Sequence, residues 1–235
     1  MTASTKTKAE VGELFTAVAH AEKYQSGNWI SKRLVNNFMG TILQTVQQAG
    51  SINVHEIGCG EGHILGMLAR NQFQVRGCDV SETSLAVARL EAERHGMNFP
   101  LQIRSVYDLD PIVDRADTVL CCEVLEHLTE PEAALKKLVS VTGKDLILSV
   151  PREPIWHLLN MARGKYWHAM GNTPGHYQHW TRQMFIDFVS QHAEIVAIKT
   201  PLPWTLIHCR PKTSTSIREI NRYDNYAPTG SNSLP

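Results

Sequence analysis

VHEIGCGEGH, residues Val54–His63, joins a short apolar run to three closely spaced glycines at 58, 60 and 62. Apolar residues then return at helical spacing over Ile64–Ala69. The pattern predicts a strand, a tight turn and a helix. Glycines suit this turn because it needs backbone angles closed to other residues, and because a ligand can then approach the main chain with no side chain between them.

Two carboxylates stand near this turn. Glu56 comes just before it, where it can accept hydrogen bonds from a ligand's amino or hydroxyl groups. Asp79 ends the next apolar segment, Phe73–Asp79. Asp79 lies about 20 residues after the turn, which is the spacing at which a nucleotide-binding fold places its ribose-binding acid. A glycine-rich turn alone is often only a turn, but with this later acid it favours a ribose-bearing ligand.

Strands and helices alternate through the first two thirds of the chain. Ala116–Cys122 is almost continuously apolar, which is typical of a central parallel strand covered on both faces. Ile195–Ile198 and Thr205–Cys209 are too close together for a helical crossover and suit an antiparallel pair. The sequence predicts an α/β fold with a doubly wound, mostly parallel sheet and right-handed crossovers. Further strands are expected at 52–57, 73–79, 101–104 and 144–150.

Helix signals lie between these strands. An amphipathic helix from Trp29 ends at Gly50, and we expect it to pack on the sheet edge. Ser81 is a natural N-cap, and so is Thr181. Thr129 and Glu132 have capping-box spacing, with a proline in the first turn.

The length of 235 residues suits one α/β domain, which we place at 29–210. Residues 152–180 are rich in aromatic and polar residues and are expected to form an insertion over the carboxyl edge of the sheet, on the substrate side. Residues 1–28 are expected to form a flexible N-terminal segment, in which Glu22–Asn28 is either a lid or a simple linker. The tail 211–235 is expected to be disordered.

Charge, cysteine spacing and apolar runs indicate which partners and which compartment to expect. Lys and Arg total 23, equal to Asp and Glu, so no net field favours a polyanion such as nucleic acid. The five cysteines lack CxxC spacing and are interpreted as small core residues in a reducing compartment. The chain shows no signal-peptide core and no apolar run near the ~18 residues of a membrane span. These features predict a cytoplasmic protein. They do not indicate how many subunits it has.

The motifs EIGCGEGH at 56–63, Asp79 and ADTVLCCEVLEHL at 116–128 together resemble the class I S-adenosylmethionine-dependent methyltransferases. The resemblance covers about residues 50–210. It implies a seven-stranded, Rossmann-like sheet whose terminal hairpin carries the one antiparallel strand. A Rossmann dehydrogenase fits less well, because the turn reads GCGEG rather than GxGxxG.

The resemblance also implies a set of cofactor-binding residues. It places the methionine portion of S-adenosylmethionine against the turn, with Glu56 at its amine, Asp79 at the ribose hydroxyls and Val80 under the adenine. Ser105 stands where the family usually has an acid, so Tyr107 or Asp108 is a candidate substitute for the adenine amino contact. The full set is Glu56, Gly58, Cys59, Gly60, Asp79, Val80, Ser105, Val106 and Glu123.

The segment Glu123–His127, EVLEH, follows the predicted central strand. On a helical turn, offsets of three and four residues place Glu126 and His127 on one face with Glu123. Three interpretations stay open: a common motif variant with a local packing role, His127 as general base, or a divalent metal that lowers the pKa of an acceptor oxygen.

The metal interpretation gains from His176, which lies shortly before a Trp-Thr-Arg helix start. This resembles the small-RNA terminal 2′-O-methyltransferases, in which an ExxEH motif and a later histidine hold one metal; ubiquinone-pathway O-methyltransferases share the ExxEH feature. The resemblance implies Glu123, Glu126, His127 and His176 as metal ligands, with Glu126, His127 and His176 as the catalytic group. Mixed oxygen and nitrogen ligands admit Mg, Mn, Fe or Zn.

These observations predict S-adenosylmethionine-dependent O-methylation of a small or lipid-linked hydroxylated metabolite. The alternatives are 2′-O-methylation of an RNA 3′ end and a cofactor-binding module without catalysis.

Overall fold

The computed structural model describes residues 29–162 and 176–212. Its centre is a seven-stranded sheet in the order β3-β2-β1-β4-β5-β7-β6. β5 and β6 both pair antiparallel with β7, and the other pairings are parallel. The predicted sheet, with its single antiparallel strand, is confirmed. The predicted N-terminal segment and lid, and the tail beyond residue 212, lie outside the described residues.

The strands lie close to their predicted positions. They are β1 (Asn53–Ile57), β2 (Gln74–Asp79), β3 (Leu101–Ile103), β4 (Ala116–Cys122), β5 (Thr142–Pro151), β6 (Ala193–Lys199) and β7 (Trp204–Pro211).

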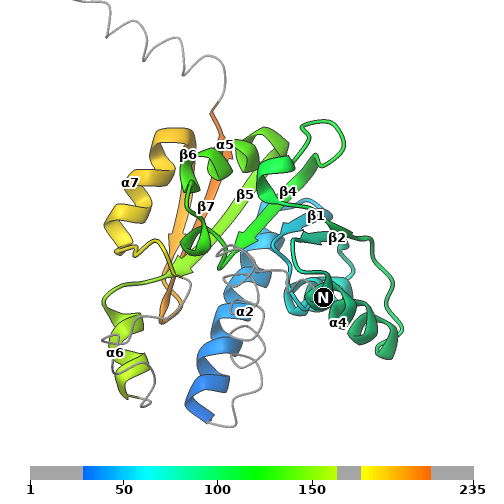
Figure 1. Ribbon diagram of the computed structural model, residues 1–235, viewed down its shortest axis with the longest axis horizontal. Helices are drawn as coiled ribbons and strands as arrows, with labels where there is room; N and C mark the ends of the chain where they lie inside the picture. The colour runs from blue at the N-terminus through cyan, green and yellow to red at the C-terminus, as the bar shows by residue number, and fades with distance from the viewer. Residues whose placement is uncertain (1–28, 163–175, 213–235) are drawn as a thin grey trace, which may run out of the picture.

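Helices cover both faces of the sheet (Figure 1). One face carries α2 (Trp29–Ala49), α3 (His63–Arg70) and α4 (Glu82–Arg94); the other carries α5 (Pro131–Val141) and α7 (Arg182–His192). A further helix, α6 (Ile155–Ala162), lies within the predicted insertion, and short 3-10 turns, η1 (Val106–Asp108) and η2 (Leu125–His127), follow β3 and β4. None of the helices in the described ranges has the length and apolar character needed to cross a membrane.

The apolar pattern of the strands divides the core into two layers, one on each face. Residues of β4 and β5 alternate between them: Val119 and Leu148 pack with α5 and α7, whereas Leu120 and Ile147 pack with α2 and α3. All five cysteines are free and buried, as predicted for small core residues.

Helix α2 does not pack on the sheet edge as the sequence suggested. It contacts β5 and α3, and the Phe38 ring stacks on Trp204 of β7 at a centroid distance of 4.5 Å. β5 and β7 are interior strands, so α2 covers a face of the sheet. Burial of Phe38, Ile42 and Val46, which recur at helical spacing, explains this placement.

The predicted caps differ in outcome. The Ser81 and Thr181 side chains accept hydrogen bonds from Ser84 N and Met184 N, so both predicted N-caps are confirmed. The capping box at Thr129 is wrong: α5 has Glu130 at its N-cap position, with no side-chain cap bond, and Pro131 begins the helix. A proline at the first position needs no amide partner, which removes one of the donors that a capping side chain would satisfy.

Candidate active site at the carboxyl edge of the sheet

The glycine turn after β1 is held against the end of β2. The N–H groups of Gly58 and Cys59 donate to the Cys78 carbonyl at 2.8 and 3.0 Å. Gly58 has φ of +76°, and a Cβ added there would overlap the Val124 side chain, which lies in the loop after β4. Glycine is therefore needed at 58 for both backbone angle and space. The turn and the EVLEH loop are direct neighbours.

Asp79 joins the turn to β2 and α4. Its Oδ2 accepts from Gly60 N, and its Oδ1 from Ser81 N, each at 2.8 Å. Burial raises the pKa of this carboxyl. A carboxylate that accepts hydrogen bonds from two backbone amides still has free lone pairs, so Asp79 can also accept hydrogen bonds from the hydroxyls of a ribose.

Glu56 is 2% exposed at the end of β1. Its Oε2 is buried and has no hydrogen-bond partner among the described residues. Burial, and next the nearby Asp79 charge, raise the pKa of Glu56 well above its usual range. A buried carboxylate of this kind is stabilised by a cation brought beside it. Glu56 therefore fits the positively charged amine of the cofactor that the sequence implied.

The remaining predicted cofactor residues fall into two groups. Val80 is 43% exposed and offers an apolar surface, and the Ser105 hydroxyl accepts from Tyr107 N at the start of η1. The Cys59 and Val106 side chains are buried in the core, so only their backbones can face a ligand. Their contacts with a cofactor stay predictions.

Glu123 lies apart from the helical turn on which the sequence placed it. The turn η2 begins at Leu125, and Glu123 has φ of +61°, a left-handed conformation. Its Oε2 accepts from Trp204 Nε1 at 2.7 Å, and its Oε1 from the Ser149 hydroxyl at 3.2 Å. The prediction that one turn presents Glu123 with Glu126 and His127 is wrong, because Glu123 has a left-handed backbone conformation and lies two residues before the turn begins.

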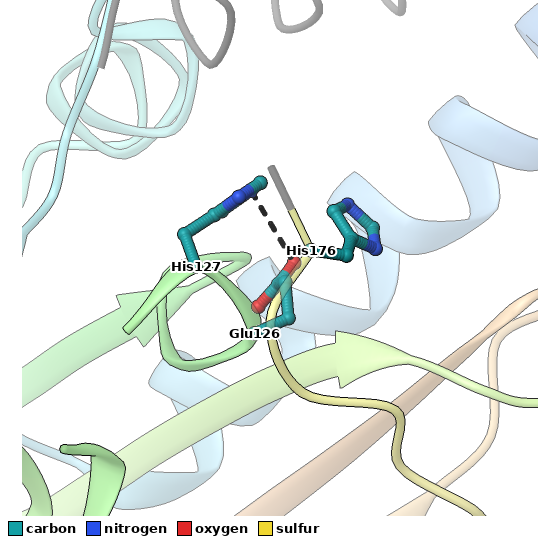
Figure 2. Close-up of side chains that lie close together, drawn as sticks. All are labelled: Glu126, His127 and His176. Atoms are coloured by element: carbon teal, nitrogen blue, oxygen red, sulfur yellow. Dashed lines mark ion pairs between the residues drawn. The ribbon is translucent and has the colours of Figure 1, made fainter. Parts of the chain in front are cut away.

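Glu126, His127 and His176 converge, each offering one ligand atom within 4.8 Å of the others (Figure 2). His127 Nε2 lies 4.0 Å from Glu126 Oε1, and the two imidazole rings meet edge to face at 4.8 Å. Glu126 is buried and the histidines are half-buried. We call these three residues the EHH cluster.

The backbone brings His176 to η2 from 49 residues along the chain. The Tyr177 and Gln178 amides both donate to the Glu126 carbonyl, at 2.8 and 3.0 Å, and Gln178 Nε2 donates to the Leu128 carbonyl. One carboxylate and two imidazoles form a donor set that suits a divalent metal. The residues present fit such an ion, and Glu123 is not a member of the group.

Trp204 is a residue of this site that the sequence did not reveal. It lies 81 residues from Glu123, in a segment interpreted only as the gap between two strands. Its antiparallel register opposite Pro151 brings it to the carboxyl edge. No local spacing in the sequence signals that contact.

Comparisons with known proteins agree with this geometry. A family model described as a methyltransferase domain matches residues 54–145. Ubiquinone biosynthesis O-methyltransferase of Coxiella burnetii (strain Dugway 5J108-111) is 31% identical over 103 residues, which are 43% of this chain and 44% of that protein. The namesake from Bradyrhizobium diazoefficiens is 34% identical over 92 residues, 39% of this chain and 36% of that protein. The match thus spans less than half of either relative.

Solved structures support the fold across most of the chain. Magnesium protoporphyrin IX methyltransferase (ChlM) from Synechocystis PCC 6803 with bound SAH superposes with a TM-score of 0.67 at 19% identity, covering 88% of this chain and 100% of that one. The methyltransferase domain of bacterial CtHen1-C gives a TM-score of 0.60 at 22% identity, covering 77% and 100%. Residues 54–145 thus match a methyltransferase domain, and most of the chain shares the fold of solved methyltransferases.

Proposed function

We propose that this chain transfers the methyl group of S-adenosylmethionine to a hydroxyl oxygen of a small or lipid-linked metabolite in the cytoplasm, with a divalent metal at the EHH cluster. The contact between Gly58 and Val124 carries the proposal. It supports a cofactor-binding turn lying directly beside the loop that presents Glu126 and His127, so that bound cofactor and acceptor would meet at one edge of the sheet.

Glu56 and Asp79 would hold the methionine and ribose portions of the cofactor. The buried Glu56 carboxylate suits the ammonium of the methionine portion, and Asp79 suits the ribose hydroxyls. S-adenosylmethionine supplies the activated methyl group as a sulfonium. The protein then needs only to align an acceptor behind that methyl and to manage the proton of its hydroxyl.

The EHH cluster would manage that proton. Glu126, His127 and His176 would hold a divalent ion, whose Lewis acidity would lower the pKa of an adjacent acceptor hydroxyl. The hydroxyl proton would pass to solvent as the oxygen takes the methyl group, and S-adenosylhomocysteine would leave as a neutral thioether. Glu123 is left out of the proposed ligand set because Trp204 and Ser149 bind its carboxylate oxygens. Its role would be to fix the start of the loop that carries Val124 and Glu126.

An oxygen acceptor is supported by the names of the relatives, two of which are ubiquinone biosynthesis O-methyltransferases. RNA 3′-end methylation is the main alternative, since the ExxEH motif with a later histidine also resembles the small-RNA enzymes. The balanced charge of 23 basic and 23 acidic residues favours the small acceptor, because RNA binding draws most of its affinity from cationic side chains.

Methyl transfer from labelled S-adenosylmethionine tests the reaction. The acceptors are catechols with and without a prenyl chain, and a short single-stranded RNA beside the same RNA with a 2′-deoxy 3′ end. Label in a catechol oxygen supports the proposal. Label that enters only the RNA with the 3′-terminal 2′-hydroxyl would replace it with the RNA function, and cofactor binding with no transfer would favour the non-catalytic module.

The metal is tested separately by stripping the protein with a chelator and adding back single divalent ions. We expect stripping to reduce transfer at least tenfold, and added metal to restore it in the wild type and in His192→Gln. Glu126→Gln and His176→Gln should stay at least tenfold slower with or without metal. His192→Gln is the matched control, because His192 pairs with Glu132 at 3.6 Å outside the cluster. Undiminished transfer in stripped protein and in both variants would remove the metal from the mechanism.

A further inference from the structure

A second group of metal-type ligands lies next to the EHH cluster and shares no residue with it. Glu153, His157 and His179 each offer one ligand atom, and these atoms all lie within 4.8 Å of one another. Glu153 stands in the turn between β5 and α6, His157 lies in α6, and His179 precedes α7. We propose that these three residues bind zinc or another late first-row divalent metal ion, which links α6 to the segment before α7.

The spacing of the ligand atoms supports this site. His157 Nε2 lies 3.2 Å and His179 Nδ1 3.7 Å from the same oxygen, Glu153 Oε1. A tetrahedral zinc ion with ligand bonds of 2.0–2.1 Å separates its ligand atoms by about 3.3–3.4 Å. Both distances are near this value, so an ion can be accommodated with only small side-chain movements.

The Glu153 carboxylate is already oriented toward both histidines. Its Oε2 accepts from the His157 backbone N–H at 3.4 Å, which leaves Oε1 facing the two imidazoles. The Glu153 N–H donates to the Trp180 carbonyl at 2.9 Å, and this bond holds His179 alongside. Backbone and side-chain bonds that orient metal ligands in this way raise metal affinity.

Two imidazoles and one carboxylate also match the chemistry of zinc. This donor set is found in zinc sites that keep a further position for water, and it suits other late first-row divalent ions more than calcium or magnesium. The Glu153 side chain is 10% exposed and His157 28%, whereas His179 is 40% exposed. The group is therefore sheltered on one side and open to an entering ion on the other.

Binding here would act on the acceptor side of the active site. His157 is the neighbour of Trp156, whose ring stacks on His176 at a centroid distance of 6.2 Å. His179 follows His176 by three residues. An ion that joins His157 to His179 would thus fix Trp156 against His176 of the EHH cluster.

Zinc titration of the tag-free full chain tests the site without reference to methyl transfer. The EHH cluster is first disabled by the double substitution Glu126→Gln/His176→Gln, so that zinc bound to this variant reports the second group. All five cysteines are buried and free, so they do not compete for zinc in the folded chain. We expect calorimetry to show a single zinc equivalent, and Co²⁺ to give the visible absorption of a tetrahedral site.

Adding His157→Gln and His179→Gln to that background should abolish both signals, whereas adding His192→Gln should leave them intact. Glu153→Gln retains the shape of the side chain and should also lose zinc. Zinc should raise the unfolding temperature only of variants that keep the group intact. The proposal is overturned if the disabled background binds no zinc, or if its zinc persists after the His157 and His179 substitutions.

Discussion

Gly58 packs against the side chain of Val124, so the turn after β1 and the loop after β4 meet at one edge of the sheet. β1 and β4 are parallel neighbours, with Glu56 opposite Leu120, so the segments that follow the two strands leave the sheet at the same edge. The residues proposed to hold the cofactor and those proposed to act on the acceptor are thereby placed side by side. This adjacency links the fold to the proposed reaction.

Glu56→Gln should weaken the binding of S-adenosylhomocysteine roughly tenfold to a hundredfold, because a charge-assisted contact with the ligand's ammonium is lost. It should not destabilise the free protein. Burial raises the pKa of Glu56, so the folded state loses stability as the pH rises from 4.5 toward the raised pKa, and glutamine removes that loss. Calorimetry and denaturation check both effects.

The control for Glu56→Gln is Glu132→Gln, an exposed carboxylate paired with Lys136. It should change neither the cofactor affinity nor the urea midpoint of unfolding, because the pair is exposed to solvent. Equal affinity in Glu56→Gln and wild type would show that the buried carboxylate does not contact the ligand.

Trp204→Phe should destabilise the fold by about 1–3 kcal/mol, because it removes the Nε1 donor to the buried Glu123 carboxylate. Urea denaturation measures the change. Trp29→Phe, at a side chain 70% exposed, should have little effect. If the two substitutions cost the same, the bond between Trp204 and Glu123 contributes nothing measurable.

His55 should make the protein acid-sensitive. Its side chain is buried beside the Asp114 carbonyl, and burial lowers its pKa from 6.5 to about 4. Below pH 6.5 the unfolded chain takes up a proton that the folded chain refuses, so stability falls as the pH drops toward 4, by roughly 2–4 kcal/mol.

His55→Asn can still donate toward the Asp114 carbonyl but does not titrate. It should flatten this part of the curve of unfolding free energy against pH. An unchanged slope between pH 6.5 and 4 would assign the acid sensitivity to other groups.

The cysteine thiols should react slowly with a disulfide reagent in the native protein. All five are buried, and burial raises the pKa of Cys78 and of Cys209 to about 12, so little thiolate is present near neutral pH. Labelling should accelerate sharply at the urea concentration at which the fold is lost. Rapid labelling of any cysteine below that concentration would contradict its buried position.

Local patterns were sufficient to predict most of the fold. The alternation of strands and helices, the caps at Ser81 and Thr181 and the closing antiparallel pair all follow from residues near one another in sequence. The placement of α2 was not predictable in this way, because an amphipathic stripe shows that a face is buried but not against which strand.

The site was predictable where one segment carries it. The turn at Gly58 and the pair Glu126–His127 are local, and His176 was found by resemblance. The contact of Trp204 with Glu123 and the grouping of Glu153, His157 and His179 depend on which distant segments the sheet brings together. Glu123 was misplaced because its left-handed backbone interrupts the expected helical turn.

The cofactor site on the glycine turn is tested most directly by calorimetric titration of S-adenosylhomocysteine into wild type, Gly58→Ala and Gly40→Ala. Gly58→Ala would force a Cβ into Val124 at a positive φ, whereas Gly40 lies in α2 with nothing within 4 Å of an added Cβ. We predict binding by wild type and Gly40→Ala, and binding at least tenfold weaker by Gly58→Ala with an unchanged circular dichroism spectrum. No binding by wild type, or equal binding by Gly58→Ala, would contradict a cofactor site on this turn.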